Sequence, residues 1–322
     1  MSSHLTSKRK NNLFFMNYLL LPLSGIFYLL VQLRFWLYEV GFLKIYISKI
    51  PVIVVGNITV GGTGKTPIVI AMVKHFESQG KTVGVVSRGY KGDYSHEILE
   101  VTSSTDPQEC GDEPALIAQN TNAKIVVAKK RSEAVKHLSN NEKVDVIISD
   151  DGLQHYAMGR DIEIAVIDGM NRFGNGFLLP AGPLREPVKR LKSVDIIVNN
   201  GASQDGELKC EIKAESFVNI ANEESQPLTY FKDKECYAVA GIGDPTKFFK
   251  LLDDLGVRSK NKAFVDHHKF VAEDFAFAKD YPVIMTSKDC VKCRHFATDQ
   301  MWYLSVHAEL NSDFYQQLES KL

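Results

Sequence analysis

Hydrophobic positions beyond residue 50 recur in two alternating patterns. Short runs of apolar, β-branched residues are separated by longer segments in which apolar residues return at helical spacing. Strands that are apolar on both faces and separated by helices are typical of a parallel sheet that helices cover on both sides. We therefore expect an α/β fold. The expected strands are 82–87, 124–128, 144–149, 162–168 and 194–199, and the expected helices are 66–79, 113–120 and 132–139.

The pattern changes after residue 204. Residues 205–234 are polar and irregular, and we expect a connecting segment there, with a hairpin as one form of it. Strands and helices then alternate again, with strands expected at 235–241, 283–286 and 302–306. The predicted organisation is an N-terminal membrane-associated segment at 1–50, a core domain at 51–204, a connection at 205–234 and a smaller α/β lobe at 235–322.

The N-terminal segment has a pattern of its own. No residue from Leu13 to Leu33 is charged, which is near the length of a helix that spans a bilayer. Basic residues precede this run, and aromatic and basic residues follow it, as at a membrane interface. A cleaved signal peptide is disfavoured because no small-x-small site follows. A spanning helix, a helix lying in one leaflet and a helix buried in the protein's own core are the alternatives, and we expect membrane contact.

Composition limits the kinds of partner. The 38 basic and 39 acidic residues nearly cancel, so no overall field favours nucleic acid. Five cysteines, an odd number, indicate reduced thiols in a cytosolic compartment. Cys290 and Cys293 form a single C-x-x-C pair, which is half of a zinc site and is better explained by chance.

The strongest chemical signal is a glycine loop that follows the apolar run 52–55. It reads Gly61-Gly62-Thr63-Gly64-Lys65-Thr66. The backbone N–H groups of such a loop and the helix N-terminus behind it bind phosphate, the lysine adds a full positive charge, and the threonine hydroxyl reaches a magnesium ion. The sequence therefore predicts a site for a nucleoside triphosphate.

The loop departs from the standard P-loop pattern at one position. That pattern has a glycine five residues before Gly64, where this chain has Thr59. A glycine-rich turn with a chance Gly-Lys-Thr is the alternative, but the order of strand, loop and helix favours the phosphate site.

Acidic residues follow the expected strand at 144–149. In a P-loop protein this strand end brings a carboxylate to the magnesium ion on the nucleotide, so we expect Asp150 and Asp151 there. Gln154 and His155 would add polar groups at the same edge.

Two further acidic and histidine motifs are ambiguous from spacing alone. Asp112 and Glu113 begin an expected helix, where acids stabilise the helix dipole without any chemistry. Asp266-His267-His268 follows an apolar stretch, and a histidine beside a carboxylate suits general-base catalysis, although a loop of no consequence would look the same.

Six motifs in order make the chain resemble a known family, the tetraacyldisaccharide 4′-kinases of lipid A biosynthesis. The resemblance extends from the apolar N-terminus to about residue 289. The motifs are Gly56-Asn57, Gly61–Pro67, Ser87-Arg88-Gly89-Tyr90, Gly111-Asp112-Glu113-Pro114, Asp150-Asp151-Gly152-Leu153-Gln154-His155 and Leu179-Pro180-Ala181-Gly182-Pro183-Leu184-Arg185-Glu186.

The resemblance implies a two-lobed P-loop kinase. Such enzymes transfer the γ-phosphoryl group of ATP to the 4′-hydroxyl of an acylated glucosamine disaccharide 1-phosphate and form lipid IVA. They work at the cytoplasmic face of the inner membrane of Gram-negative bacteria. Carried to this chain, the resemblance pairs Asp112 with His267 to activate the acceptor hydroxyl, while the neighbouring His268 leaves the choice of histidine open.

The remaining site residues are assigned with the same resemblance. Lys65 would neutralise phosphate charge, and ATP and Mg²⁺ are the expected cofactors. The expected metal-binding residues are Thr66, Asp150, Asp151 and Glu113, and the expected substrate-binding residues are Asn57, Arg88 and Arg185. A run of basic residues consists of Arg185, Lys189, Arg190 and Lys192. We expect some of them to bind the substrate's 1-phosphate or lipid headgroups, and a solvated helix face is the alternative.

Two other classes of protein are alternatives to the kinase. A membrane-attached P-loop GTPase or metal-insertion ATPase would phosphorylate nothing, but the nearest guanine-type motif, Thr286-Ser287-Lys288-Asp289, has the wrong spacing. A non-catalytic lipid-binding protein that uses ATP only for structure is a weaker alternative. Protein partners, oligomeric state and acyl-chain preference are not encoded in any motif.

Overall fold

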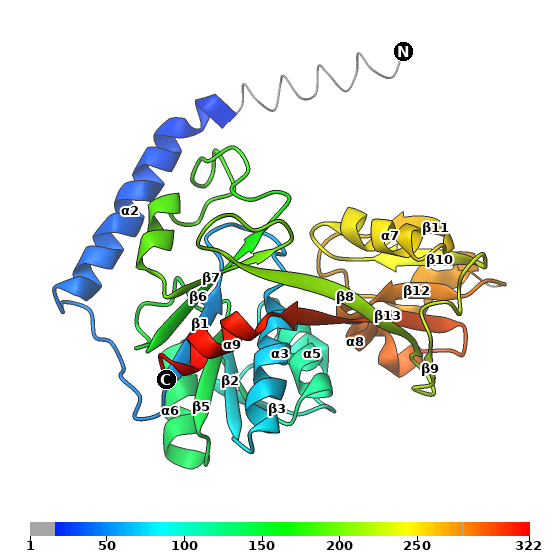
Figure 1. Cartoon of the computed structure of the whole chain (residues 1–322), viewed down its shortest axis with the longest axis horizontal. Coiled ribbons are helices and arrows are strands. Elements are labelled where there is room, and N and C mark those ends of the chain that lie inside the picture. The colour runs from blue at the N-terminus through cyan, green and yellow to red at the C-terminus, as the bar shows by residue number, and fades with distance from the viewer. Residues whose placement is uncertain (1–16, 279) are drawn as a thin grey trace.

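All strands of the computed structural model, which describes residues 17–278 and 280–322, join one mixed sheet. The order across this thirteen-stranded sheet is β11-β10-β12-β13-β8-β7-β6-β1-β5-β2-β4-β3, with β9 paired to β8. Two α/β lobes lie side by side along it (Figure 1). The expected class, a largely parallel sheet covered by helices, is confirmed.

The larger lobe is built on parallel strands close to the expected ones. β1 lies between β5 and β6, and only β3 at the edge runs antiparallel, paired with β4. The strands are β1 (Val52–Gly56), β2 (Val83–Ser87), β3 (Ile98–Val101), β4 (Lys124–Ala128), β5 (Val146–Asp150), β6 (Ile162–Asp168) and β7 (Ile196–Asn200).

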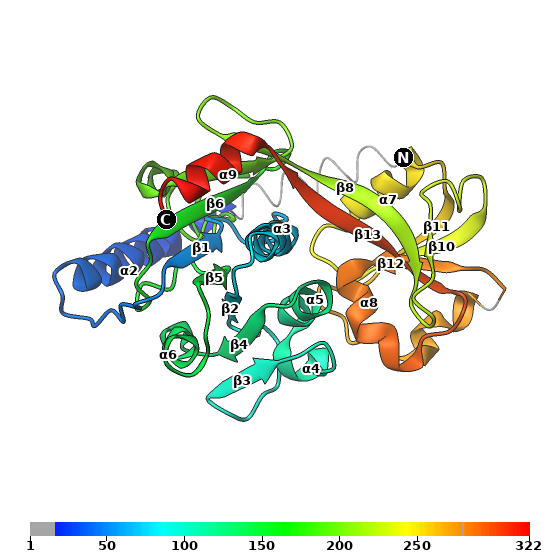
Figure 2. The same ribbon diagram turned by 60° about the horizontal axis from the view of Figure 1, so that its bottom comes forward.

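Alternate residues of β1 face two separate cores, which explains why the strand is apolar throughout. Ile53 and Val55 pack with the helices α3 (Lys65–Ser78), α5 (Asp112–Asn120) and α9 (Ser312–Glu319). Val52 and Val54 pack on the other face with α6 (Arg131–Asn141). Helices therefore cover both sides of the parallel strands, as the sequence pattern predicts (Figure 2).

The smaller lobe repeats this plan with fewer elements. β10 (Glu235–Ala240) pairs in parallel with both β11 (Arg258–Ala263) and β12 (Val283–Thr286). α7 (Pro245–Asp254) packs on one face through Phe248 and Leu252, and α8 (Ser287–Cys293) packs on the other through Cys290 and Cys293. The shorter elements of the chain are α4 (Pro107–Cys110) and three 3₁₀ helices, η1 (Val188–Ser193), η2 (Ala272–Ala278) and η3 (Arg294–Phe296).

A pair of long antiparallel strands joins the two lobes. β8 (Leu208–Asn219) lies within the expected connection 205–234, pairs with β13 (Met301–Leu310), and pairs again with the short β9 (Ser225–Gln226). β8 also pairs with β7, and β13 with β12, so the sheet is continuous from one lobe to the other. The predicted domain boundaries stay a prediction.

Helix α2 (Leu21–Glu39) stands at the side of the larger lobe (Figure 1). It is long and apolar enough to cross a membrane by length and composition, and only 6% of its most apolar window is buried. Ser24 ties it to the lobe by donating to Leu178 O at 2.8 Å and accepting from Ala181 N at 3.1 Å. The helix therefore does not lie in the protein's own core. Residues 13–16 of the expected apolar segment lie outside the described residues.

Candidate active site

The glycine loop has the shape and the open space that a phosphate group needs. Gly61 and Gly64 have φ angles of +107° and +87°, in the region that favours glycine. Gly64 is the N-cap of α3, so the helix begins at Lys65. A Cβ atom added at Gly61 or Gly62 would meet nothing within 4 Å. The loop thus presents backbone and a helix N-terminus to open space.

Asn200, which no sequence motif indicates, lies so close to Gly64 that only glycine fits there. The amide of Asn200, at the end of β7, donates to Thr63 O at 3.2 Å. A Cβ atom at Gly64 would lie 2.6 Å from that amide nitrogen. Asn200 therefore supports the loop from the adjacent strand end, a contact across 137 residues for which the chain carries no local signal.

The departure at Thr59 has a structural reason. Residues 58–60 are extended and pair with the 183–185 segment: Val60 N donates to Pro183 O at 2.8 Å, and Arg185 N donates to Ile58 O at 2.7 Å. A β-branched residue suits this extended backbone better than glycine. The loop is therefore fixed to the segment that carries Arg185.

Asn57, expected at the substrate, is fully buried beneath the same loop. Its amide nitrogen lies 3.4 Å from Thr59 Oγ1 and 3.5 Å from Gly61 O. Its own carbonyl accepts a hydrogen bond from Gln154 at 3.0 Å. In this structure Asn57 contacts the loop and the segment after β5.

Asp151 lies between three basic side chains at the end of β5. Lys65 Nζ is 3.4 Å from Asp151 Oδ1, Arg185 donates to Oδ2 at 2.9 Å, and Arg131 donates to the backbone oxygen at 2.6 Å. Burial raises the pKa of Asp151, but the charges of Lys65 and Arg185 outweigh it and hold that pKa well below its usual range. Its φ of +53° is rare for a residue with a side chain and marks a strained position at the site.

Asp150 has the surroundings of a cation ligand. It is 3% exposed, and its Oδ1 is buried without a hydrogen-bond partner. The pKa of Asp150 is raised to about 7, mainly by burial; the charge of Lys65 opposes the rise, and the carboxylates of Glu113 and Asp151 add to it. A divalent cation would relieve this cost, so the residues fit a magnesium ion. No three His, Cys, Asp or Glu side chains cluster as a metal site within residues 17–278 and 280–322, so nucleotide phosphates would have to complete the coordination.

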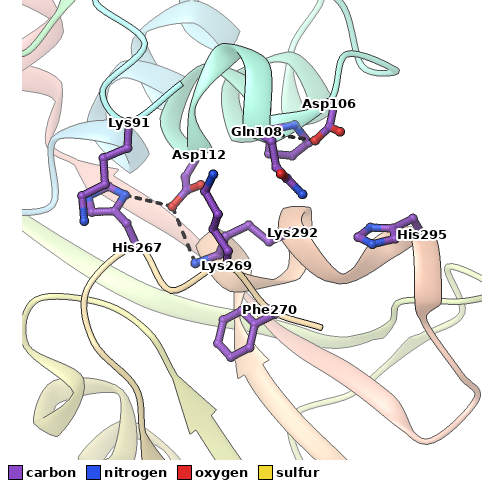
Figure 3. Close-up of a pocket in the computed structure, with 10 residues that line it drawn as sticks. Lys91, Asp106, Gln108, Asp112, His267, Lys269, Phe270, Lys292 and His295 are labelled. Atoms are coloured by element: carbon purple, nitrogen blue, oxygen red, sulfur yellow. Dashed lines mark hydrogen bonds and ion pairs between the residues drawn. The ribbon is translucent and has the colours of Figure 1, made fainter. Parts of the chain in front are cut away.

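Asp112 and His267 meet across the boundary between the lobes (Figure 3). Asp112 begins α5 after Gly111, whose φ is +91°, and His267 follows β11. His267 Nδ1 lies 3.0 Å from Asp112 Oδ2, although 155 residues separate the two in the chain. The His267 backbone has a φ of +60°, and its N–H donates to Gly241 O at 3.0 Å, which orients the ring. We call these two residues the dyad.

His268 occupies a different environment from His267. Its Nε2 lies 2.8 Å from Asp274 Oδ2, and its ring packs against Phe264 and Phe270. Among the described contacts only His267 of the two histidines reaches Asp112. The geometry thus selects His267 as the candidate, while its role stays a prediction.

Two lysines of α8 face the acids at the start of α5. Lys288 Nζ is 2.6 Å from Glu113 Oε1 and 3.4 Å from His267 Nε2, and Lys292 Nζ is 3.6 Å from Asp112 Oδ2. Burial raises the pKa of Asp112, but the His267 hydrogen bond and the two lysine charges together lower it. Glu113, expected at the metal, is thus paired with Lys288 here. Neither lysine is assigned to the site from the sequence. Lys288 lies in the segment Thr286–Asp289 that ends the family resemblance, whereas Lys292 lies beyond it and has no such signal.

We call the glycine loop, Lys65, Asp150 and Asp151 the phosphate side of the site. The other expected substrate residues, Arg185 and Arg88, lie on this side. Arg185 contacts Asp151 and lies 3.4 Å from Gln154 Oε1. Arg88 is exposed, and its charge reaches His155. Burial first, and then the charges of four arginines, Arg88 among them, lower the pKa of His155 to about 4. A strongly positive environment therefore surrounds the acids.

One member of the basic run is not available to a ligand. Arg190 is 10% exposed and is held by the carboxylates of Glu163, at 2.5 Å, and Glu186, at 3.2 Å. Lys189 instead donates to the hydroxyl of Tyr28 on α2 at 3.0 Å. Of the basic run, Arg185 and Lys192 therefore remain as the residues expected to bind the 1-phosphate or lipid headgroups, and Lys189 contacts α2.

The motif compared with guanine-binding proteins has a structural use. Asp289 is fully buried and accepts hydrogen bonds from Gly241 N at 2.9 Å and from Thr286 Oγ1 at 2.7 Å. A carboxylate enclosed in this way does not face a nucleotide base. The geometry thus gives the GTPase alternative no support.

The chain is similar over nearly its whole length to known proteins of one family. A model of the family described as tetraacyldisaccharide-1-P 4′-kinase matches residues 16–322. A tetraacyldisaccharide 4′-kinase of Ruthia magnifica subsp. Calyptogena magnifica is 54% identical over 306 residues, which are 95% of this chain and 97% of that protein. One from Hahella chejuensis is 45% identical over 314 residues, which are 95% of this chain and 92% of that protein.

A solved structure extends the likeness to the fold. The crystal structure of LpxK from Aquifex aeolicus in complex with ATP matches with a TM-score of 0.79 at 30% identity, covering 94% of this chain and 98% of that chain. Both the sequence and the fold are thus matched over nearly their full length. The chain belongs to the tetraacyldisaccharide-1-P 4′-kinase family.

Proposed function

We propose that this chain transfers the γ-phosphoryl group of ATP to the 4′-hydroxyl of a tetraacylated glucosamine disaccharide 1-phosphate, forming lipid IVA in lipid A biosynthesis. Family membership supports the reaction. The observation that carries the proposal is the closeness of the two halves of the site. The ring of His267 lies 5.3 Å from the ring of Tyr90, which follows β2, and β2 pairs in parallel with β5, whose end carries Asp150. The influence of the Glu113 charge on the Asp150 pKa agrees with this closeness. This arrangement supports a single site that contains Asp150, Asp151 and the dyad.

ATP and magnesium are the cofactors of the proposal. The glycine loop and Lys65 would bind the phosphates, and Thr66, Asp150 and Asp151 would hold the metal, with Glu113 near them. The bound metal neutralises phosphate charge during transfer. The unpartnered oxygen of Asp150 and the open space before Gly61 and Gly62 support this assignment.

The dyad would bind and orient the acceptor hydroxyl. With the Nδ1–H of His267 donated to Asp112 Oδ2, the second carboxylate oxygen of Asp112 is free to accept the hydroxyl proton. The lowered pKa keeps Asp112 ionised near neutral pH, although it also makes the carboxylate a weak base. A weak base suffices, because phosphoryl transfer has a loose transition state and depends mainly on position and charge.

Contact between the lobes would exclude water from the reaction. Besides the dyad, Lys247 Nζ of α7 lies 2.5 Å from Asp168 Oδ2 at the end of β6. Lys91 Nζ of the larger lobe donates to Asp266 O of the smaller lobe at 3.1 Å. A site that is complete only when the lobes touch limits the hydrolysis of ATP by water.

Membrane contact through α2 would bring the lipid to the site. The helix exposes large apolar side chains, and the 177–185 segment to which Ser24 is bonded also pairs with residues 58–60 beside the phosphate loop. ATP is cytoplasmic, so the proposed location is the cytoplasmic face of the inner membrane. Access of a membrane-impermeant thiol reagent to an engineered cysteine at Ser2 from the periplasmic side would distinguish a spanning helix from one lying in the leaflet.

The direct test is transfer of label to lipid. The protein is incubated with γ-labelled ATP, magnesium and the acylated disaccharide 1-phosphate in detergent, and the lipid is extracted and counted. We expect label in the lipid that depends on magnesium. Intact ATP binding with no labelled lipid would contradict the kinase proposal and favour the non-catalytic alternative.

A further inference from the structure

We propose that Lys292, held by the buried carboxylate of Asp289, is a positioning residue that fixes the Asp112 carboxylate for phosphoryl transfer. The inference deepens the proposed function and rests on it for the identity of the reaction. It assigns a role to a side chain that contacts neither the phosphate loop nor the expected metal residues, and it concerns the orientation of the dyad.

Asp289 is the fixed point of the arrangement. It is fully buried at the start of α8, and its Oδ2 accepts hydrogen bonds from Gly241 N at 2.9 Å and from Thr286 Oγ1 at 2.7 Å. Its other oxygen, Oδ1, accepts from Lys292 Nζ at 2.7 Å. A buried carboxylate is costly unless it is paired and hydrogen-bonded, and here both oxygens are.

Lys292 connects the buried Asp289 to Asp112 in the larger lobe. Its side chain is 7% exposed, its ammonium lies 4.9 Å from the centre of the Phe270 ring, and it is 3.6 Å from Asp112 Oδ2 (Figure 3). One ammonium thus lies between two carboxylates from different lobes. Because Asp289 is enclosed and Lys292 is buried, neither has much freedom to move, and Asp112 has a fixed partner.

Asp289 also reaches the other half of the dyad through the backbone. Gly241 donates its N–H to Asp289 Oδ2, and its carbonyl accepts the N–H of His267 at 3.0 Å. The same carboxylate therefore supports Asp112 through Lys292 and His267 through Gly241. Displacement of a reacting group by 1 Å costs about 100-fold in rate, so this support bears on turnover.

The variant Lys292→Met tests the proposal because it keeps the length of the side chain and removes its charge. We expect kcat to fall roughly 10- to 100-fold while the KM for ATP stays within about twofold. Lys250→Ala, which removes an exposed lysine of the same lobe, is the control and should leave both constants unchanged. Unchanged kcat in Lys292→Met, or a KM for ATP that rises as much as kcat falls, would overturn the proposal.

A double-mutant cycle separates positioning from a merely structural role. If Lys292 acts through Asp112, Lys292→Met should lower kcat little further in a protein that already carries Asp112→Asn. Full additivity would show that Lys292 acts by another route. Thermal melting and ATP binding of each variant report whether the fold and the phosphate side are intact.

A measurement that does not depend on catalysis distinguishes failure of this inference from failure of the proposed reaction. The ring nitrogen signals of His267, assigned by comparison with a His267→Gln variant, are followed by NMR in the ATP-free protein. We expect Lys292→Met to shift the signal of the nitrogen that faces Asp112. No shift would refute the positioning role even if the wild type phosphorylates the lipid. A shift in a protein that labels no lipid would refute the reaction alone.

Discussion

The phosphate side and the dyad side of this site are built in different ways. The phosphate side comes mainly from one continuous stretch, residues 52–66, in which strand, loop and helix follow one another. The dyad is assembled from positions 155 residues apart, on two lobes joined by a shared sheet. The first is complete within one lobe, whereas the second exists only while the lobes touch. We therefore expect substitutions to separate the binding of ATP from the proposed activation of the acceptor.

The largest effect is expected from the phosphate side. Lys65→Ala removes the cation at the loop and leaves Asp151 with only its arginine partners, so we expect kcat to fall by about 1,000-fold and ATP binding to weaken as well. Lipid labelling and equilibrium binding of ATP would measure the two effects. Loss of turnover with unaltered ATP affinity would contradict this prediction, because Lys65 would then behave like a residue of the dyad.

The dyad should respond differently. Asp112→Ala and His267→Ala are each expected to lower kcat by about 100-fold and to leave the KM for ATP nearly unchanged. The roles proposed for these residues are general-base catalysis and orientation of the hydroxyl, and neither residue contacts the phosphate loop. His268→Ala is the matched control, since its ring contacts Asp274 and two phenylalanines instead. If His268→Ala is the more damaging of the two histidine changes, the assignment of His267 is wrong.

The smallest expected effect concerns stability on the phosphate side. Burial, together with the surrounding arginines, lowers the pKa of His155 to about 4 from an unfolded value near 6.5. Between these pH values the unfolded chain binds more protons than the native one, so the free energy of unfolding falls as the pH drops through that window. His155→Gln should flatten this fall, which melting temperatures between pH 7 and pH 4.5 would detect. An equally steep fall in the variant would assign the acid sensitivity to other groups.

Local patterns predicted most of the larger lobe. The strands at 124–128, 162–168 and 283–286 were predicted to the residue, because uninterrupted β-branched runs between helices leave few alternatives. The glycine loop and the acids after β5 were predicted for the same reason, since each motif is adjacent to the element that presents it.

Long-range relations were not predictable from the pattern. Residues 205–234 were interpreted as a connection because their sequence is polar and irregular. In the structure, part of this segment is strand β8, whose charged residues suit a strand with a solvent face. Lys288 as the partner of Glu113 and Glu163 as a partner of Arg190 were not predictable, because ion pairs across 175 and 27 residues leave no mark in local spacing. The second partner of Arg190, Glu186, is only four residues away. Charge type was predictable, but the choice of partner required the fold.

The two-stranded link has a consequence for the strength of the contacts across the site. Between its ends, β8 and β13 pair with each other alone over residues 211–216 and 305–309, with an irregularity at Ser305 and Val306. This ribbon keeps the lobes at a high effective concentration, so closure is an intramolecular event. Each contact between the lobes can then be weak and still form often. Weak contacts also separate readily, which suits an enzyme that must release a bulky product after every turnover.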